Sequence, residues 1–166
     1  FTNKNLDKTY DILLYGSVHP RHYPFRKRLF DLIKNNSDKY NICVIDKPEI
    51  YDPCKCENGL CDMINRSKLA IATKSRYDYL VAKYLEIICS GSIICGNMAT
   101  DGQIIYSDNY LKLNENMTDE DIISNIDDFL VNYENNKSKI EKAYKCIIEE
   151  YNLDNYVKKL LNIILQ

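Results

Sequence analysis

Short, continuous apolar runs punctuate the first hundred residues of the chain. They predict strands over 10–15, 41–45, 69–72 and 92–95. Runs this short, without regular polar alternation, are typical of strands that are buried on both faces of a parallel sheet. Gly16-Ser17 and Lys47-Pro48 follow two of these runs and are turn signals.

Apolar residues recur at helical spacing between these strands. They predict a helix from Phe25 to about Asn35, a short helix over 61–64 and a longer one over 79–89, whereas we interpret 96–102 as a loop. The resulting β-α-β-α-β-α-β order predicts an α/β, Rossmann-like fold in which helices flank a parallel sheet.

The last third of the sequence predicts one short strand followed by helices. The strand covers 110–113, and Thr118 is placed to cap a helix that runs to about Tyr133. Amphipathic spacing predicts two further helices over 137–150 and 153–165. We expect residues 1–166 to form a single domain.

Composition narrows the class of protein. Apolar residues make up 45% of the 166 residues and charged residues 28%, which is typical of a globular domain. The net charge of -2 gives no basic field, so we expect no nucleic-acid partner. No apolar run is long enough for a membrane span, and we expect a cytoplasmic protein, in the host cytoplasm if the source is a virus. Because the sequence starts at Phe1, we expect it to be a piece of a longer protein.

Three of the seven cysteines are close together in the sequence. Cys54, Cys56 and Cys61 would supply three thiolate ligands to zinc, but no second C-x2-C motif accompanies them. We therefore favour reduced cysteines and expect no metal site.

Basic residues gather behind the first predicted strand, where an open parallel sheet binds its ligands. Gly16-Ser17 opens this loop, and the basic positions are Arg21, His22, Arg26, Lys27 and Arg28. Such a cluster beside a helix N-terminus favours phosphate binding, and the alternative is a solvated basic helix face. The segment lacks a complete G-x-G-x-x-G motif.

A carboxylate lies in the mostly apolar helix before the fourth predicted strand. A buried Glu86 needs hydrogen-bond donors, and the two hydroxyl groups of a ribose would provide them. Lys83, three residues earlier, would meet a phosphate. The alternative is an ordinary Lys83–Glu86 pair within the helix.

Several segments together carry a family resemblance. The strings YDILLYGS, YPFRKRL, INRSKLAIATKSRYDYLVAKYLEIICSGSIICGN and DEDIISNIDDFL resemble the C-terminal domain of GT-B glycosyltransferases. Among these enzymes, the strings resemble the group-one family related to the spore maturation protein CgeB. The resemblance extends from about residue 10 to residue 165, and its most specific part is the block K-Y-L-E-x-x-x-x-G at 83–91.

The resemblance implies a domain that binds a nucleoside diphosphate sugar, with UDP favoured, and no tightly bound cofactor or metal. Glu86 matches the family glutamate that holds the ribose hydroxyls, and Gly16 and Ser17 match the turn beside the diphosphate. The basic residues Arg26, Lys27 and Lys83 would neutralise the diphosphate and assist its departure. An acceptor-binding N-terminal domain is expected outside this chain.

The same resemblance implies further contacts to the donor. Asp78 occupies a position, eight residues before Glu86, where many relatives carry glutamate. The loop 96–102, with Asn97 and Thr100, would approach the pyrophosphate or sugar. It lacks the proline that relatives often have there.

Two other functions remain open from the sequence. One is a non-catalytic module of the same fold that binds a nucleotide or sugar. The other is a flavodoxin-like or response-regulator domain, which shares the α/β alternation. Thr73-Lys74 follows the third predicted strand where a response regulator needs an aspartate, which argues against that reading.

Overall fold

One parallel sheet runs through the centre of the molecule. The computed structural model describes residues 1–45, 59–150 and 152–164. Its strands are β1 (Tyr10–Tyr15), β2 (Ile42–Ile45), β3 (Ser67–Ile71), β4 (Ile93–Gly96) and β5 (Leu111–Lys112). They are all parallel, in the order β2-β1-β3-β4-β5. The predicted Rossmann-like α/β fold is confirmed.

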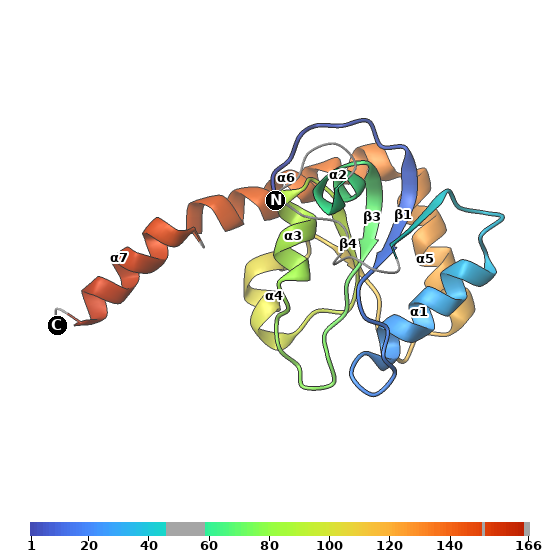
Figure 1. Cartoon of the computed structure of the whole chain (residues 1–166), viewed down its shortest axis with the longest axis horizontal. Coiled ribbons are helices and arrows are strands. Elements are labelled where there is room, and N and C mark those ends of the chain that lie inside the picture. Colours follow the sequence, from blue (N-terminus) through green and yellow to red (C-terminus); the bar gives the residue numbers. More distant parts are fainter. Residues whose placement is uncertain (46–58, 151, 165–166) are drawn as a thin grey trace.

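Helices cover both faces of this sheet (Figure 1). One face packs against α1 (Pro24–Asn35), α5 (Asp119–Val131) and the first turns of α6 (Tyr133–Glu150). The other face packs against α2 (Leu60–Asn65), α3 (Lys83–Cys89), α4 (Thr100–Tyr106) and the middle of α6. The molecule therefore has three layers, with a separate hydrophobic cluster on each side of the sheet.

The alternation of side chains along β1 shows why its sequence is continuously apolar. Ile12 and Leu14 belong to the cluster under α1 and α5, whereas Leu13 and Tyr15 belong to the cluster under α3. All four are almost completely buried. Burying each such side chain contributes about 1.5–3 kcal/mol, so a polar residue at any of these positions would be costly.

Two helices between β3 and β5 differ from the sequence prediction. We expected the third helix to begin at Tyr79, but α3 begins at Lys83, because 79–82 turns between the end of β3 and the helix. We interpreted 96–102 as a loop, but α4 begins at Thr100. Gly102 in this helix allows close packing: an added Cβ would lie 2.7 Å from Met98 Sδ and 2.8 Å from Leu80 Cδ1.

The chain leaves the body of the molecule at the end of α6 (Figure 1). α6 starts at Tyr133, directly after the C-cap Asn132 of α5, and not at the predicted residue 137. α7 (Leu153–Ile164) continues outward beyond α6 (Figure 1). Among the helices that the structure describes, none has both the length and the apolarity required to cross a membrane.

Candidate phosphate-binding site

The strand order creates a switch point between β1 and β3. From β1 the chain passes to β2 on one side, and then crosses back to β3 on the other side. The loops that follow β1 and β3 therefore diverge, and open α/β sheets bind ligands at such a crevice. The order 2-1-3-4-5 is the flavodoxin-like one, and it differs from the 3-2-1-4-5-6 order of a full dinucleotide-binding fold.

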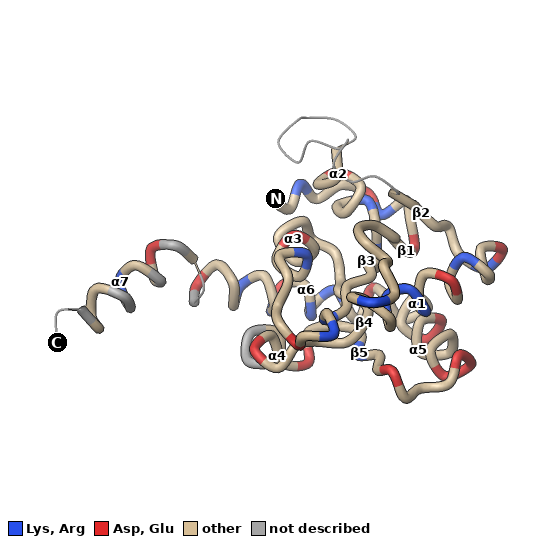
Figure 2. Tube along the Cα trace, turned by 60° about the horizontal axis from the view of Figure 1, so that its bottom comes forward, with Lys and Arg blue, Asp and Glu red and all other residues tan. Residues whose placement is uncertain are grey.

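Arg26, in the first turn of α1, joins these two loops. Its Nη2 donates a hydrogen bond of 2.8 Å to the carbonyl oxygen of Thr73, and its Nη1 donates one of 3.2 Å to the carbonyl oxygen of Ser17. The side chain is buried, and its Nε has no hydrogen-bond partner. Figure 2 shows basic residues at the start of α1 and of α3 near the carboxyl edge of the sheet.

Lys83, the first residue of α3, lies beside Arg26. Its amino group donates a hydrogen bond to the carbonyl oxygen of Tyr15 and lies 3.7 Å from the centroid of the Tyr15 ring. Burial, and after it the neighbouring Arg26 guanidinium, hold the pKa of Lys83 well below its ordinary value. We call Gly16, Ser17, Arg26 and Lys83 the cationic cradle.

Gly16 is required in the cradle for two reasons. Its φ of +83° is a left-handed conformation that side chains disfavour. In addition, a Cβ at this position would lie 2.5 Å from Nζ of Lys83. Glycine therefore leaves the space that the lysine amino group occupies.

The cradle brings two buried basic groups together. Among the described residues, Arg26 and Lys83 form no ion pair: they contact backbone carbonyl oxygens and the rings of Tyr23 and Tyr15. The nearby Glu86 carboxylate opposes the lowering of the Lys83 pKa without pairing with it. Burying a charge without a counter-charge is costly, so a bound anion would stabilise this arrangement. The adjoining open hollow has a volume of about 320 Å³ and is lined by Tyr15, Gly16, Ser17, Tyr23, Arg26, Leu60, Val81, Ala82, Lys83 and Glu86.

Glu86 lies at the side of this hollow and is half-buried, less than we expected. The hydroxyl group of Tyr15 donates a 3.1 Å hydrogen bond to its Oε2. Burial, and then the Glu86 carboxylate, raise the pKa of Tyr15 well above its ordinary value. The pair Lys83–Glu86 that we considered as an alternative does not form an ion pair, because Lys83 turns to the Tyr15 carbonyl instead.

Tyr15 is the residue that sequence reasoning missed. It was assigned only to the end of a buried strand, yet it contacts both Lys83 and Glu86. The sequence signal that could have identified it is a tyrosine at the carboxyl end of a predicted buried strand. The buried hydroxyl group of such a tyrosine needs a hydrogen-bond partner.

Lys27 lies outside the cradle, although we expected it to meet the diphosphate. The helical turn that buries Arg26 directs the next side chain away, and Lys27 pairs with Asp31 one turn later on α1. Arg28 likewise turns away and binds Asp119 at 2.6 Å.

The predicted residues of the loops after β3 and β4 form a second polar cluster. Thr100 Oγ1 donates a 2.7 Å hydrogen bond to Asp78, and Lys74 Nζ lies 3.1 Å from the same carboxylate. The Thr100 hydrogen bond, followed by Lys74, lowers the pKa of Asp78. Asn97 accepts a 3.0 Å hydrogen bond from the backbone of Lys74 and donates one of 2.8 Å to Glu115. These side chains fix the two loops to each other.

The cysteine cluster is described only in part. Cys54 and Cys56 lie outside the described residues. Cys61 is buried in α2, with its Sγ 3.6 Å from Ser90 Oγ. In the described ranges, no group of three or more His, Cys, Asp or Glu side chains is arranged to hold a metal ion.

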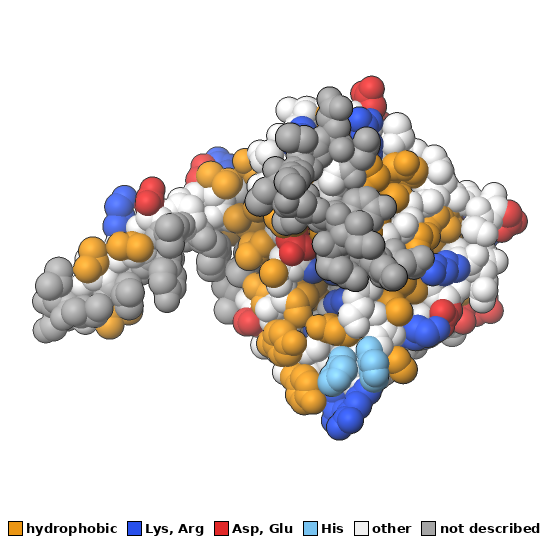
Figure 3. Space-filling model, in the orientation of Figure 1, with side chains coloured by type: hydrophobic (Ala, Val, Ile, Leu, Met, Phe, Trp, Pro, Cys, Tyr) orange, Lys and Arg blue, Asp and Glu red, His pale blue; other side chains and the backbone are white. Residues whose placement is uncertain are grey.

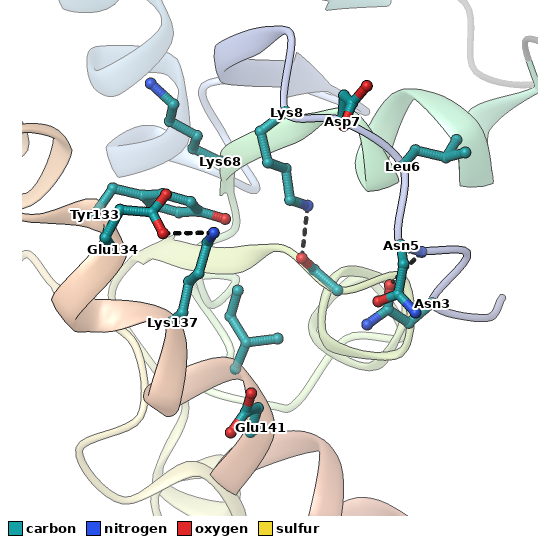
Figure 4. Close-up of a pocket in the computed structure, with 12 residues that line it drawn as sticks. Asn3, Asn5, Leu6, Asp7, Lys8, Lys68, Tyr133, Glu134, Lys137 and Glu141 are labelled. Carbon is teal, nitrogen blue, oxygen red and sulfur yellow. Dashed lines mark hydrogen bonds and ion pairs between the residues drawn. The ribbon is translucent and has the colours of Figure 1, made fainter.

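A larger hollow, of about 600 Å³, lies at the opposite, amino edge of the sheet (Figure 4). Two of its lysines are neutralised by carboxylates: Lys137 lies 2.6 Å from Glu134, and Lys68 lies 2.7 Å from Asp11. Its positive charge is therefore largely balanced, in contrast to the charge of the cradle.

The third lysine of this hollow, Lys8, has a structural role. Its amino group donates hydrogen bonds of 2.6 Å to the carbonyl oxygens of both Asn65 and Gly91. Figure 4 shows Lys8 with one such contact as a dashed line. Burial, and then Lys137, lower the pKa of Lys8 to about 8. Lys8 thus fastens the N-terminal segment to the sheet, and we place the candidate site at the cradle despite the smaller volume there.

Comparison of the chain with protein-family models, with curated proteins and with solved structures finds no match in any of the three. The family and its activity therefore stay predictions from the sequence, and the structure adds the fold and the charge distribution of the cradle.

Proposed function

We propose that this chain is the donor-binding domain of a GT-B glycosyltransferase and binds a nucleoside diphosphate sugar at the cationic cradle. The observation that carries the proposal is the pair of buried basic groups without an ion-pair partner, Arg26 and Lys83, at the switch point of the sheet. A diphosphate is the anion that fits, because it brings more than one negative charge to two adjacent cations.

Glu86 supports a nucleoside attached to that diphosphate. The Tyr15 hydroxyl group fixes Glu86 Oε2 at the side of the hollow, three residues along α3 from Lys83. A carboxylate oriented in this way accepts hydrogen bonds from the vicinal hydroxyl groups of a ribose. The ribose and the diphosphate would thus bind to one helix and to the end of one strand.

The cradle would also assist the reaction. When the bond between the sugar and the diphosphate breaks, negative charge develops on the departing oxygen, and fixed cations stabilise it. The approach of the diphosphate favours the charged form of Lys83, so the lysine would act as an ammonium ion. The acceptor site, and the general base if the enzyme inverts, would belong to an acceptor-binding N-terminal domain that the resemblance implies outside this chain.

The test is calorimetric titration with UDP and GDP of the wild type and of the variants Lys83→Met and Glu86→Ala. We expect one nucleotide to bind in the micromolar to millimolar range and each variant to weaken it at least about tenfold, the loss of one charge-assisted contact. Lys142→Met is the matched control, because Lys142 is exposed on α6. Binding that is equal in all four proteins would refute the site.

A second candidate follows from the strand order, which is the flavodoxin-like one. Flavodoxin-like domains bind flavin mononucleotide at this switch point, so FMN is the third titrant. Tight binding of FMN without binding of either nucleoside diphosphate would favour this function. The response-regulator alternative remains disfavoured, because Gly16-Ser17 and Thr73-Lys74, and not carboxylates, follow β1 and β3.

The third candidate is a non-catalytic nucleotide-binding module. It is favoured by the use of both cations to hold backbone carbonyl oxygens, which gives them a structural role as well. Sugar transfer by the longer protein, abolished by Lys83→Met, separates an enzyme from such a module.

A further inference from the structure

Exposed rings and guanidinium groups line the carboxyl edge next to the cradle. We call His19, Arg21, His22, Arg76 and Tyr77 the rim. The ring centroids of His19 and His22 are 5.2 Å apart, those of His22 and Tyr77 are 6.4 Å apart, and the Arg76 guanidinium lies 5.1 Å from the Tyr77 ring centroid. Figure 3 shows the two histidines side by side at the surface, with basic residues next to them.

The rim is held in place by backbone contacts and not by side-chain packing. The Arg76 N–H donates a 3.0 Å hydrogen bond to the carbonyl oxygen of His22, which ties the loop after β3 to the loop after β1. The Tyr77 N–H donates to Ser75 Oγ at 3.1 Å. The side chains stay open to solvent, and Tyr77 is 61% exposed. An ordered backbone that presents exposed rings is suited to binding, because little of it needs to be ordered on contact.

The charge of the rim is positive and unneutralised. Arg21 and Arg76 are exposed, and among the described residues neither is ion-paired. Two carboxylates lie in the small hollow that Arg76 lines: Asp78 is bound by Lys74 and Thr100, and Glu115 accepts a hydrogen bond from Asn97. A ligand at the rim therefore meets aromatic rings together with two guanidinium groups that no carboxylate binds, one of which lies over the Tyr77 ring.

The rim continues directly from the cradle. The His19 N–H lies 3.4 Å from Ser17 Oγ, and the Arg26 guanidinium lies 4.0 Å from the centroid of the Tyr23 ring, which lines the hollow. The cradle therefore adjoins both Glu86, which lines the same hollow, and the rim, through Ser17 and His19. A donor with its ribose at Glu86 and its diphosphate at the cradle would direct its sugar to the rim.

We propose, on the basis of the proposed function, that the sugar bound at the rim is acidic, of the hexuronic acid class. One face of the sugar ring packs on the exposed rings of His22 and Tyr77. Its carboxylate accepts hydrogen bonds from the guanidinium group of Arg76, with Arg21 as the second cation, since arginine binds carboxylates in a planar, two-point geometry.

The test is calorimetric titration with two pairs of donors: UDP-glucose against UDP-glucuronate, and GDP-mannose against GDP-mannuronate. We expect the acidic sugar of the nucleotide that binds to be held about tenfold tighter than its neutral counterpart. Arg76→Gln should reduce this preference to less than about twofold and leave the affinity for the bare nucleoside diphosphate unchanged. Arg66→Gln is the matched control, because Arg66 lies at the amino edge, before β3, and the change in net charge is the same.

The outcomes separate this inference from the proposed function. Nucleotide binding without a preference for the acidic sugar overturns the inference and leaves the donor site standing. A preference that survives in a variant with both Arg21→Gln and Arg76→Gln also overturns it, because the rim is then not the recognition site. If neither nucleotide binds, both proposals fail.

Discussion

At the scale of single residues, Lys83 occupies a position that is costly for the fold. Its amino group is buried beside Arg26 without an ion-pair partner, and burial, followed by Arg26, lowers its pKa more than the nearby Glu86 raises it. Replacing a buried, unneutralised charge by an apolar side chain of similar length commonly stabilises a protein.

We therefore predict that Lys83→Met raises the free energy of unfolding by about 1 kcal/mol or more at pH 7 while it abolishes most of the nucleotide affinity. Urea unfolding of the isolated chain measures the first quantity. A loss of stability in this variant would mean that the contact with the Tyr15 carbonyl outweighs the cost of the buried charge.

At the scale of elements, caps and turns decide where the helices begin. α5 starts with a capping box, in which Thr118 Oγ1 accepts a 3.1 Å hydrogen bond from the Asp121 N–H and the Asp121 carboxylate is placed to accept from the Thr118 N–H. The helix that this cap begins is part of the core, because it buries Ile122, Ile126 and Phe129 against the sheet.

We predict that Thr118→Ala lowers the free energy of unfolding by about 1 kcal/mol, the usual cost of losing an N-cap. Ser124→Ala, at an exposed position in the interior of the same helix, is the control and should be neutral or slightly stabilising. Chemical denaturation of the two variants compares them directly. Equal stability would show that the cap contributes nothing to the folded domain.

At the scale of the whole molecule, α7 projects from the three-layer body (Figure 1). Val157, Leu161 and Ile163 are 42%, 48% and 73% exposed, so these side chains contribute little to the core. Truncations are tolerated where the removed segment buries little surface and few hydrogen bonds.

We predict that a chain ending at residue 152 keeps the free energy of unfolding within about 1 kcal/mol and binds nucleotide as the longer chain does. The measurements are urea unfolding and the same calorimetric titration. A chain that fails to fold without α7 would show that the helix packs against the body more than its exposure indicates.

The sequence by itself determined the fold class, because buried parallel strands such as Leu69–Ala70–Ile71 must be continuously apolar and the helices between them must carry one apolar face. It also pointed to the carboxyl edge as the place for Arg26, Lys83 and Glu86. It could not show which neighbouring cation joins the cradle, since the consecutive side chains of Arg26 and Lys27 point in directions about 100° apart around the helix.

Tertiary structure alone decided the contacts between segments far apart in the chain. Sequence spacing suggested a Lys83–Glu86 pair, yet Lys83 binds the Tyr15 carbonyl and Glu86 binds the Tyr15 hydroxyl group, across 68 and 71 residues. Likewise we interpreted 96–102 as a loop, although α4 begins at Thr100 and Gly102 packs closely against Met98 and Leu80. The local sequence pattern determines which face of each helix or strand is buried. The partner of a buried polar group depends instead on which strands become neighbours in the sheet.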